Sequence, residues 1–281
     1  MNFPNPEYDA ALTQTVRIAE TLRAQDIDAQ IVRNQLDEPL AVVARNILDP
    51  RTILGSVRLH QLKQQVDAFQ ATDEESEAHY RVRETFPVAG ESESLVLPAS
   101  FLQVIDLAVQ AAMDTPDIFA TELESYPIVS RKADDRGWLN LNTHIDYSTH
   151  LEDEIAAKPI SGLNIHVTRS GSCAAMFGLV RSFADVQRIG AISDKDSLAK
   201  ELGAPFSRPV ELGTGDAVIF QAGPHKKLGR LPVAHEFFTT GQETRYSELY
   251  IPTGYELAAA VLPLRQQIAR DFQLTHLGYA A

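Results

Sequence analysis

The chain has 281 residues, of which 44% are hydrophobic and 22% are charged. This composition is typical of a folded globular protein and argues against disorder. The net charge of −13 disfavours a nucleic-acid partner, because phosphates would be repelled. No apolar run approaches the ~18 residues of a membrane span, and no secretory signal is visible. The single cysteine, Cys173, excludes an internal disulfide. We therefore expect a cytoplasmic protein without a membrane partner.

Helices are predicted in the first 125 residues. Apolar residues recur at three- and four-residue spacing from Tyr8 to Ala24 and, more weakly, over residues 59–70. The same spacing recurs from Phe101 to Met113, and Pro116 then breaks the pattern. We expect these helices to form a support layer.

Short alternating segments follow from about residue 126. The predicted strands are 138–146, 162–168, 217–221, 234–240 and 245–252. Glycines, prolines and polar residues separate them, as is typical of an antiparallel sandwich or barrel. Residues 183–188 and 195–202 are predicted to be short helical excursions, and the tail from Glu256 to Gln273 is predicted to be a helix interrupted at Pro263.

No linker separates these parts, so a single α+β domain over residues 1–281 is predicted. It would comprise a helical support region (1–125), a β core (126–256) that makes the fold mainly β, and a C-terminal helix (257–281).

His144 and Asp146 are the first candidate functional pair. Side chains two residues apart on a strand point to the same side, so one imidazole and one carboxylate can face a small ion together. Alone this signal is weak, because about 0.5 such pairs are expected by chance in a chain of this composition.

A sharper pattern follows the turn Gly215-Asp216. An apolar strand leads to His235, Arg245 comes ten residues later, and Ser247 lies two residues beyond it. We expect strands 234–240 and 244–250 to form a hairpin, with His235 opposite Leu249. Arg245 would then lie about 13 Å along the strands from His235. The side chain of Arg245 can span about half of that distance, and the remaining gap suits a short dicarboxylate with one end on a metal and the other on the guanidinium. Arginine makes a planar two-point contact with a carboxylate, and Ser247 can add a hydroxyl donor.

Two histidines and one carboxylate on one face of a metal are the ligand set of non-haem Fe(II) oxygenases. The segments His144-Ile145-Asp146, Gly215-Asp216, His235 and Arg245-Tyr246-Ser247 resemble the motif set of the Fe(II)/2-oxoglutarate-dependent oxygenase superfamily. This resemblance spans residues 144–247 and implies that the β core is a double-stranded β-helix, a jelly roll similar to the cupins.

The resemblance also implies two groups of site residues: the Fe(II) ligands His144, Asp146 and His235, and the 2-oxoglutarate contacts Arg245, Ser247 and Asn142. The implied reaction uses O2 to hydroxylate an unactivated C–H bond, while 2-oxoglutarate is decarboxylated to succinate and CO2. Related halogenases have a small non-ligating residue at the position of Asp146, so the carboxylate here favours hydroxylation.

The proportions of the chain are similar to those of bacterial hydroxylases of amino acids and N-acyl amino acids, such as N-succinyl amino acids. This narrower resemblance implies a small, carboxylate-bearing substrate. Weak candidates for its anchor are Arg83, Arg131 and Arg169. A homodimer is left open.

Three other histidines are considered as metal ligands. His166 is the main rival for the second histidine, but a hydrogen-bonded structural histidine is the simpler interpretation. Surface loops are the simpler interpretation of His150 and His225. Two other functions stay open: a cupin-like metal-binding protein or isomerase that uses no 2-oxo acid, and a hydroxylase of protein side chains.

Overall fold

The computed structural model describes residues 6–48, 60, 63–64, 84–87, 99–130, 132–133, 137–138, 141–145, 162–189, 197, 200, 206–224, 230–239 and 245–257. The helices are α1 (Pro6–Arg23), α3 (Ala99–Met113) and α5 (Phe183–Ile189). The strands are β1 (Ala29–Arg33), β2 (Pro39–Ala44), β3 (Glu84–Pro87), β4 (Ile118–Ser130), β5 (Lys132–Ala133), β6 (Gly137–Trp138), β7 (Leu141–His144), β8 (Leu163–Ser170), β9 (Cys173–Leu179), β10 (Val210–Leu212), β11 (Ala217–Gln221), β12 (Val233–Thr239) and β13 (Arg245–Leu257).

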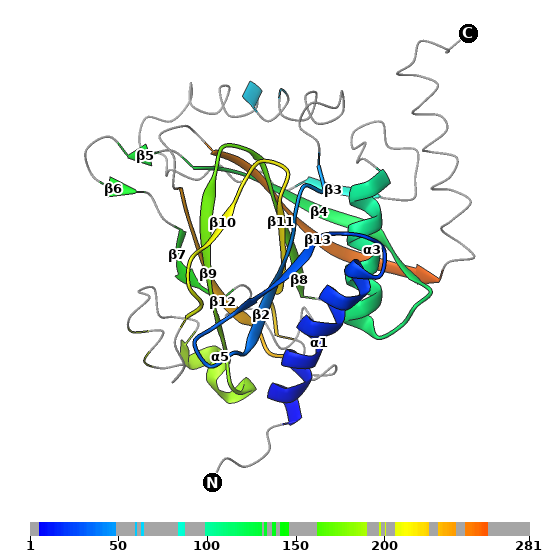
Figure 1. Ribbon diagram of the computed structural model, residues 1–281, viewed down its shortest axis with the longest axis vertical. Helices are drawn as coiled ribbons and strands as arrows, with labels where there is room; N and C mark the ends of the chain where they lie inside the picture. Colours follow the sequence, from blue (N-terminus) through cyan, green and yellow to red (C-terminus); the bar gives the residue numbers. More distant parts are fainter. Residues whose placement is uncertain are drawn as a thin grey trace.

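The β core consists of two antiparallel sheets that pack face to face (Figure 1). The seven-stranded sheet has the order β1-β2-β11-β8-β13-β4-β3, and the four-stranded sheet has the order β10-β9-β12-β7. Neighbours in each sheet are often far apart in sequence, as Ala217 of β11 beside Ala44 of β2 shows. The described part of the chain is therefore mainly antiparallel β, with few helices.

Alternation along each strand divides its side chains between two cores. In β11, Val218 and Phe220 point into the space between the sheets and pack with Phe177 and Phe237 of the four-stranded sheet. Ile219 points the other way, toward the helices. This follows from the two-residue period of a strand, and it makes the whole of β11 a buried strand with two apolar faces.

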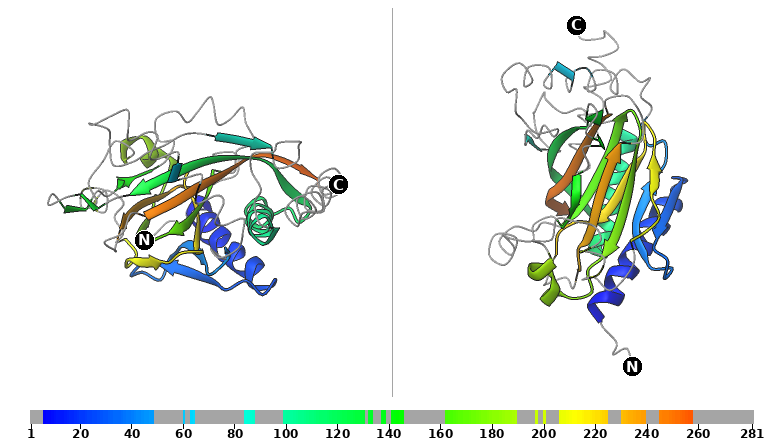
Figure 2. Two further views of the ribbon diagram at one scale, coloured as in Figure 1. Left: turned by 90° about the horizontal axis from the view of Figure 1, so that it is seen from above. Right: turned by 90° about the vertical axis from the view of Figure 1, so that its left-hand side faces the viewer.

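Helices α1 and α3 cover the outer face of the seven-stranded sheet, beside which they lie in Figures 1 and 2. Leu22 of α1 and Ile105 of α3 are buried in this layer, and Phe101 of α3 meets Tyr250 of β13 at 5.0 Å between ring centroids. Each fully buried side chain of this size contributes roughly 1.5–3 kcal/mol to folding. The apolar stripes that predict these two helices in the sequence are thus the surfaces that attach them to the sheet.

The turn at Gly215-Asp216 is held by one carboxylate. Asp216 accepts hydrogen bonds from the backbone N–H of Asn46 (3.0 Å) and of Gly213 (2.9 Å), and it pairs with Arg45 at 2.7 Å. Gly215 has a φ of 92°, and a Cβ there would lie 2.3 Å from the carbonyl oxygen of Leu48. The motif therefore ties the start of β11 to the end of β2, and it needs glycine at its first position.

Several predicted elements are confirmed and others are corrected. The helices near Tyr8–Ala24, Phe101–Met113 and 183–188 correspond to α1, α3 and α5. The expectation that residues 1–125 are helical is wrong for β1 and β2, which join the seven-stranded sheet. All residues of β2 are buried, so its sequence shows an apolar run without alternation, and periodicity cannot separate such a strand from a buried helix.

The predicted hairpin between β12 and β13 is also wrong. Strand β12 has β9 and β7 as its neighbours, whereas β13 lies between β4 and β8 in the other sheet. Each edge of a strand can pair with one neighbour, so β12 has no edge left for β13. Leu249, which was expected opposite His235, pairs with His166 instead.

Part of the predicted tail lies outside the described residues, which end at Leu257, and Glu256 still belongs to β13. Most of the helix expected at 195–202 and most of the one expected at 59–70 also lie outside them.

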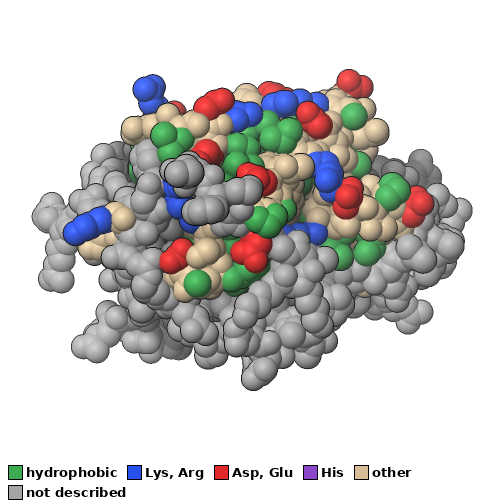
Figure 3. Space-filling model, turned by 90° about the horizontal axis from the view of Figure 1, so that it is seen from below, with side chains coloured by type: hydrophobic (Ala, Val, Ile, Leu, Met, Phe, Trp, Pro, Cys, Tyr) green, Lys and Arg blue, Asp and Glu red, His purple; other side chains and the backbone are tan. Residues whose placement is uncertain are grey.

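The described surface is polar. Figure 3 shows acidic and basic side chains interspersed over one face, with small groups of hydrophobic side chains between them. Leu36, at 56% exposure, is the one large hydrophobic side chain that is exposed among the described residues. No described helix is long and apolar enough to cross a membrane.

Candidate functional site

The structure describes the predicted site residues to different extents. His235, Arg245 and Ser247 are described with their side chains. Asn142 and His144 are described as positions in strand β7. Asp146 lies outside the described residues, as do the candidates His150, His225, Arg83 and Arg131.

Strand pairing brings the two predicted histidine ligands together. In the four-stranded sheet, His235 of β12 lies opposite His144 of β7. On its other side, His235 lies opposite Phe177 of β9. Two positions that are 91 residues apart in the sequence are thus direct neighbours in the sheet.

The imidazole of His235 is buried between the two sheets. Its ring lies 4.6 Å from that of Phe220, in the facing sheet, and 5.8 Å from that of Phe237, measured between centroids. Its Nδ1 is 3.2 Å from the carbonyl oxygen of Val233. A carbonyl can only accept, so Nδ1 carries the proton of this hydrogen bond, and in the neutral imidazole the lone pair is then on Nε2, through which a metal could be bound.

Arg245 is a fully buried cation in the same space. The side chain is 0% exposed, and its Cζ lies 5.5 Å from the centroid of the Phe237 ring. Burial lowers the pKa of Arg245, but a guanidinium stays protonated in proteins. Among the described residues no carboxylate pairs with it, and its Nε has no hydrogen-bond partner. A charge in such a place is costly unless an anion joins it.

A second buried arginine, Arg169, provides a contrast within the same sheet. Its Nε pairs with Glu248 at 2.5 Å, and one of its terminal nitrogens donates to the hydroxyl of Tyr250 at 2.6 Å. Although burial alone would lower it, the charge of Glu248 and the contacts with Tyr250 raise the pKa of Arg169. Arg169, a weak candidate for the substrate anchor in the sequence, is thus occupied by Glu248 and Tyr250 in this structure. Glu248 thus neutralises Arg169, whereas no described carboxylate does the same for Arg245.

Ser247 lies two residues from Arg245 and therefore on the same face of β13. It is buried and lies opposite Thr168 of β8. The hydroxyl of Thr168 is 3.8 Å from the sulfur of Cys173. Ser247 thus shares a strand face with Arg245, and a hydroxyl on that face can add a hydrogen bond to an anion.

His166, which the sequence presented as a rival metal ligand or, more simply, as a hydrogen-bonded structural histidine, is hydrogen-bonded to Arg245. Its Nε2 lies 2.8 Å from a terminal nitrogen, Nη2, of Arg245, and its ring meets that of Phe237 edge-on at 4.1 Å. Burial, followed by the charges of Arg245 and His235, holds the pKa of His166 well below its usual range. The available signal was the alternation in β8, where Asn164, His166 and Thr168 are polar and the residues between them are apolar.

One phenyl ring connects these groups. Phe237 lies within 6 Å of the imidazoles of His166 and His235 and of the guanidinium of Arg245. A candidate metal ligand and a candidate anion anchor therefore flank the same ring between the sheets. Within the described part of the chain, no cluster of three or more His, Cys, Asp or Glu residues could hold a metal. The predicted ligand Asp146 is not in that part.

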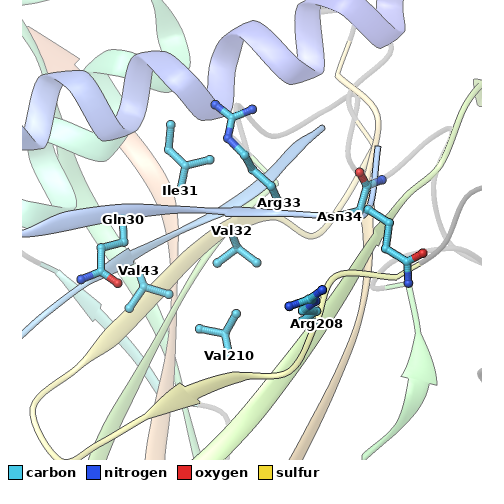
Figure 4. Close-up of a pocket in the computed structure, with 9 residues that line it drawn as sticks. Gln30, Ile31, Val32, Arg33, Asn34, Val43, Arg208 and Val210 are labelled. Atoms are coloured by element: carbon cyan, nitrogen blue, oxygen red, sulfur yellow. The ribbon is translucent and has the colours of Figure 1, made fainter. Parts of the chain in front are cut away.

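A different pocket, of about 550 Å³, opens beside the edge strands β1 and β10 (Figure 4). Val32, Val43 and Val210 lie around it, with Gln30 and Arg208 among its polar lining. It contains none of the predicted site residues, so it is separate from the site around Phe237.

Comparisons with known proteins find distant structural matches. No family model and no curated protein matches the sequence. The structure is similar to a prolyl-4-hydroxylase of Pseudomonas putida (11% identity over 84% of this chain and 97% of that chain, TM-score 0.41). It is also similar to an oxidoreductase of the 2OG-Fe(II) oxygenase family from Burkholderia pseudomallei (16% identity, 86% and 89%, TM-score 0.34).

A third match is the oxalate decarboxylase of Lactobacillus farciminis (8% identity, 48% of this chain and 26% of that chain, TM-score 0.24). The chains that this protein resembles thus include 2-oxoglutarate/Fe(II) oxygenases. Similarities of this size assign no function by themselves.

Proposed function

We propose that this protein is an Fe(II)/2-oxoglutarate-dependent dioxygenase that hydroxylates a small molecule, built on a double-stranded β-helix. The observation that carries the proposal is Arg245. A buried guanidinium with an unpartnered Nε, and with no carboxylate beside it among the described residues, is suited to an anionic ligand that enters the space between the sheets.

The distal carboxylate of 2-oxoglutarate would be that anion. Arg245 would bind it by a charge-assisted hydrogen bond, and the hydroxyl of Ser247 would add a donor. Because Arg245 is shielded from water, the attraction between the two charges is stronger than it would be at the surface. Asn142, which precedes His144 in β7 by two positions, is proposed as a further contact to the co-substrate.

The iron would be held by His144, Asp146 and His235. Two observations support the histidines: the pairing of β7 with β12 puts them opposite each other, and the bond to Val233 leaves the His235 lone pair on Nε2. Residues that lie opposite each other in neighbouring strands share a face of the sheet. When bound, Fe(II) and O2 would supply the oxidising chemistry, in which 2-oxoglutarate gives succinate and CO2 and the substrate is hydroxylated.

The protein residues would orient both reactants and exclude water. Phe237 and Phe220 surround His235 with apolar surface, and Phe237 separates it from Arg245. A diacid held at one end by Arg245 would point its 2-oxo acid end toward His235. For the substrate we propose an amino acid or an N-substituted amino acid, such as an N-succinyl amino acid.

Succinate release tests this proposal. The Fe(II)-loaded protein is incubated with 2-oxoglutarate and O2 in the presence of free amino acids, N-acyl amino acids or other small carboxylates. At least one of these should raise succinate release well above the substrate-free rate, and Arg245→Ala should abolish the effect. A metal-dependent activity that needs no 2-oxo acid and survives Arg245→Ala would instead indicate a cupin-like protein or isomerase.

A further inference from the structure

The guanidinium of Arg245 has one hydrogen-bond partner among the described side chains, and that partner is a histidine. Nη2 of Arg245 lies 2.8 Å from Nε2 of His166 and 3.5 Å from Nδ1 of the same ring. His166 is buried in β8, and its ring stands at 87° to that of Phe237. Both members of the pair are therefore fixed against the same phenyl ring.

The direction of this hydrogen bond is set by chemistry. A guanidinium can only donate, so His166 must accept, and it must be the neutral imidazole with its lone pair on Nε2. The environment favours this form, because burial and the neighbouring charge of Arg245 both hold the pKa of His166 low. The ring thus orients the cation without cancelling its charge.

The comparison with Arg169 shows why a neutral acceptor matters. Arg169 is oriented by Glu248, and the carboxylate of Glu248 also neutralises it. A carboxylate in the place of His166 would do the same to Arg245, and it would compete with any anionic ligand. A neutral acceptor leaves the full positive charge and the Nε–H of Arg245 available.

We propose that His166 is a positioning residue for the co-substrate, which holds the guanidinium of Arg245 so that its remaining N–H groups meet the distal carboxylate of 2-oxoglutarate. The inference rests on the proposed function, since it takes 2-oxoglutarate as the ligand. It adds a residue that acts through Arg245 and does not itself bind iron.

Three substitutions of His166 separate its effect on the orientation of the Arg245 guanidinium from its effect on the charge of that group. His166→Gln keeps a neutral acceptor, His166→Leu removes the acceptor, and His166→Glu replaces it with a carboxylate. The affinity of each anaerobic, Fe(II)-loaded protein is measured by calorimetry for 2-oxoglutarate and for 2-oxopentanoate, which lacks the distal carboxylate. Melting temperatures without ligand report any effect on folding.

The expected order of 2-oxoglutarate affinity is wild type, then His166→Gln, then His166→Leu, then His166→Glu. His166→Leu should weaken binding by about 10- to 100-fold, the loss expected for a hydrogen bond to a charged group. His166→Glu should weaken it further. The affinity for 2-oxopentanoate should stay the same in all four proteins, because it makes no contact that depends on the guanidinium. A residue with a merely structural role would change both affinities together.

The outcomes distinguish this inference from the proposed function. If the wild type does not bind 2-oxoglutarate, the proposed function fails, and the positioning role fails with it. If the wild type binds it and His166→Leu and His166→Glu bind it equally well, the positioning role is wrong and the proposed function stands. If His166→Leu does not fold, the comparison of His166→Gln with His166→Glu decides, and equal affinities contradict the inference.

Discussion

His144 and His235 lie opposite each other in the neighbouring strands β7 and β12. The chain between them includes β8 and β11 of the facing sheet as well as β9 and β10 of their own. Their proximity is thus a property of the whole fold. It gives the proposed iron site two ligand positions on one small area of the four-stranded sheet.

The first prediction concerns these two histidines. His144→Ala and His235→Ala should each weaken Fe(II) binding by more than about 100-fold, because loss of even an outer-shell partner of a metal ligand typically costs 10- to 100-fold. Equilibrium dialysis under nitrogen measures the bound iron. His60→Ala is the matched control, since His60 is exposed, and it should bind iron as the wild type does. Unchanged iron binding in His235→Ala would refute its role as a ligand.

The second prediction compares two buried arginines, Arg245 and Arg169. Arg245→Met should abolish 2-oxoglutarate binding, yet the unliganded variant should be at least as stable as the wild type, because the substitution removes an uncompensated buried charge. Arg169→Met should instead lose about 3–5 kcal/mol of unfolding free energy, because it leaves Glu248 buried without its partner. Urea denaturation measures both values.

The opposite order of stabilities would mean that Arg245 is neutralised inside the protein. Arg245 would then need no anionic ligand to balance its charge.

The third prediction concerns Gly215. Gly215→Ala should destabilise the protein by about 1–3 kcal/mol, the usual cost of a strained backbone conformation, because of its positive φ and the close carbonyl of Leu48. The melting temperature should fall while the folded protein keeps its affinity for 2-oxoglutarate, because the turn holds β11 against β2 and does not contact the proposed ligand. Gly213→Ala is the control, since the nearest atom to its added Cβ lies 3.7 Å away. A Gly215→Ala protein as stable as the wild type would contradict this account of the turn.

The fourth prediction concerns Cys173. Burial raises the pKa of Cys173, although Arg245 and Thr168 act in the opposite direction, so little thiolate is present at neutral pH. A disulfide reagent should therefore react very slowly with the folded protein and release one equivalent of thiol only after denaturation, since Cys173 is the single cysteine. Fast reaction of the native protein would show that this part of the inter-sheet space is open.

Local sequence patterns predicted where helices and strands occur better than they predicted which strands pair with each other. The periodicity of Tyr8–Ala24 predicted α1, and the alternation around His235 and Arg245 predicted β12 and β13. The hairpin was wrong because sequence neighbours were assumed to pair, whereas the chain passes from one sheet to the facing one between these strands. Both side chains nevertheless point into the same space, because sheets that pack face to face share their inner faces.

The sequence predicted individual candidate site residues, but it did not predict the contacts between their side chains. The contact of His166 with Arg245 joins residues 79 positions apart, and no local pattern encodes that pairing. That no carboxylate of the described segments pairs with Arg245 is likewise a property of the folded core. In the sequence, Arg169 is one of three weak candidates for a substrate anchor, and its pairing with Glu248 and Tyr250 is visible only in the folded protein.

Anaerobic absorption spectroscopy tests the central claim most directly. Fe(II) and 2-oxoglutarate are added to the protein under nitrogen, separately and together. We predict a weak visible metal-to-ligand absorption that needs both components in the wild type and is absent in His235→Ala and Arg245→Met. A wild-type protein that gives no such absorption at saturating Fe(II) and 2-oxoglutarate would contradict the proposal that iron and the diacid bind together between the sheets.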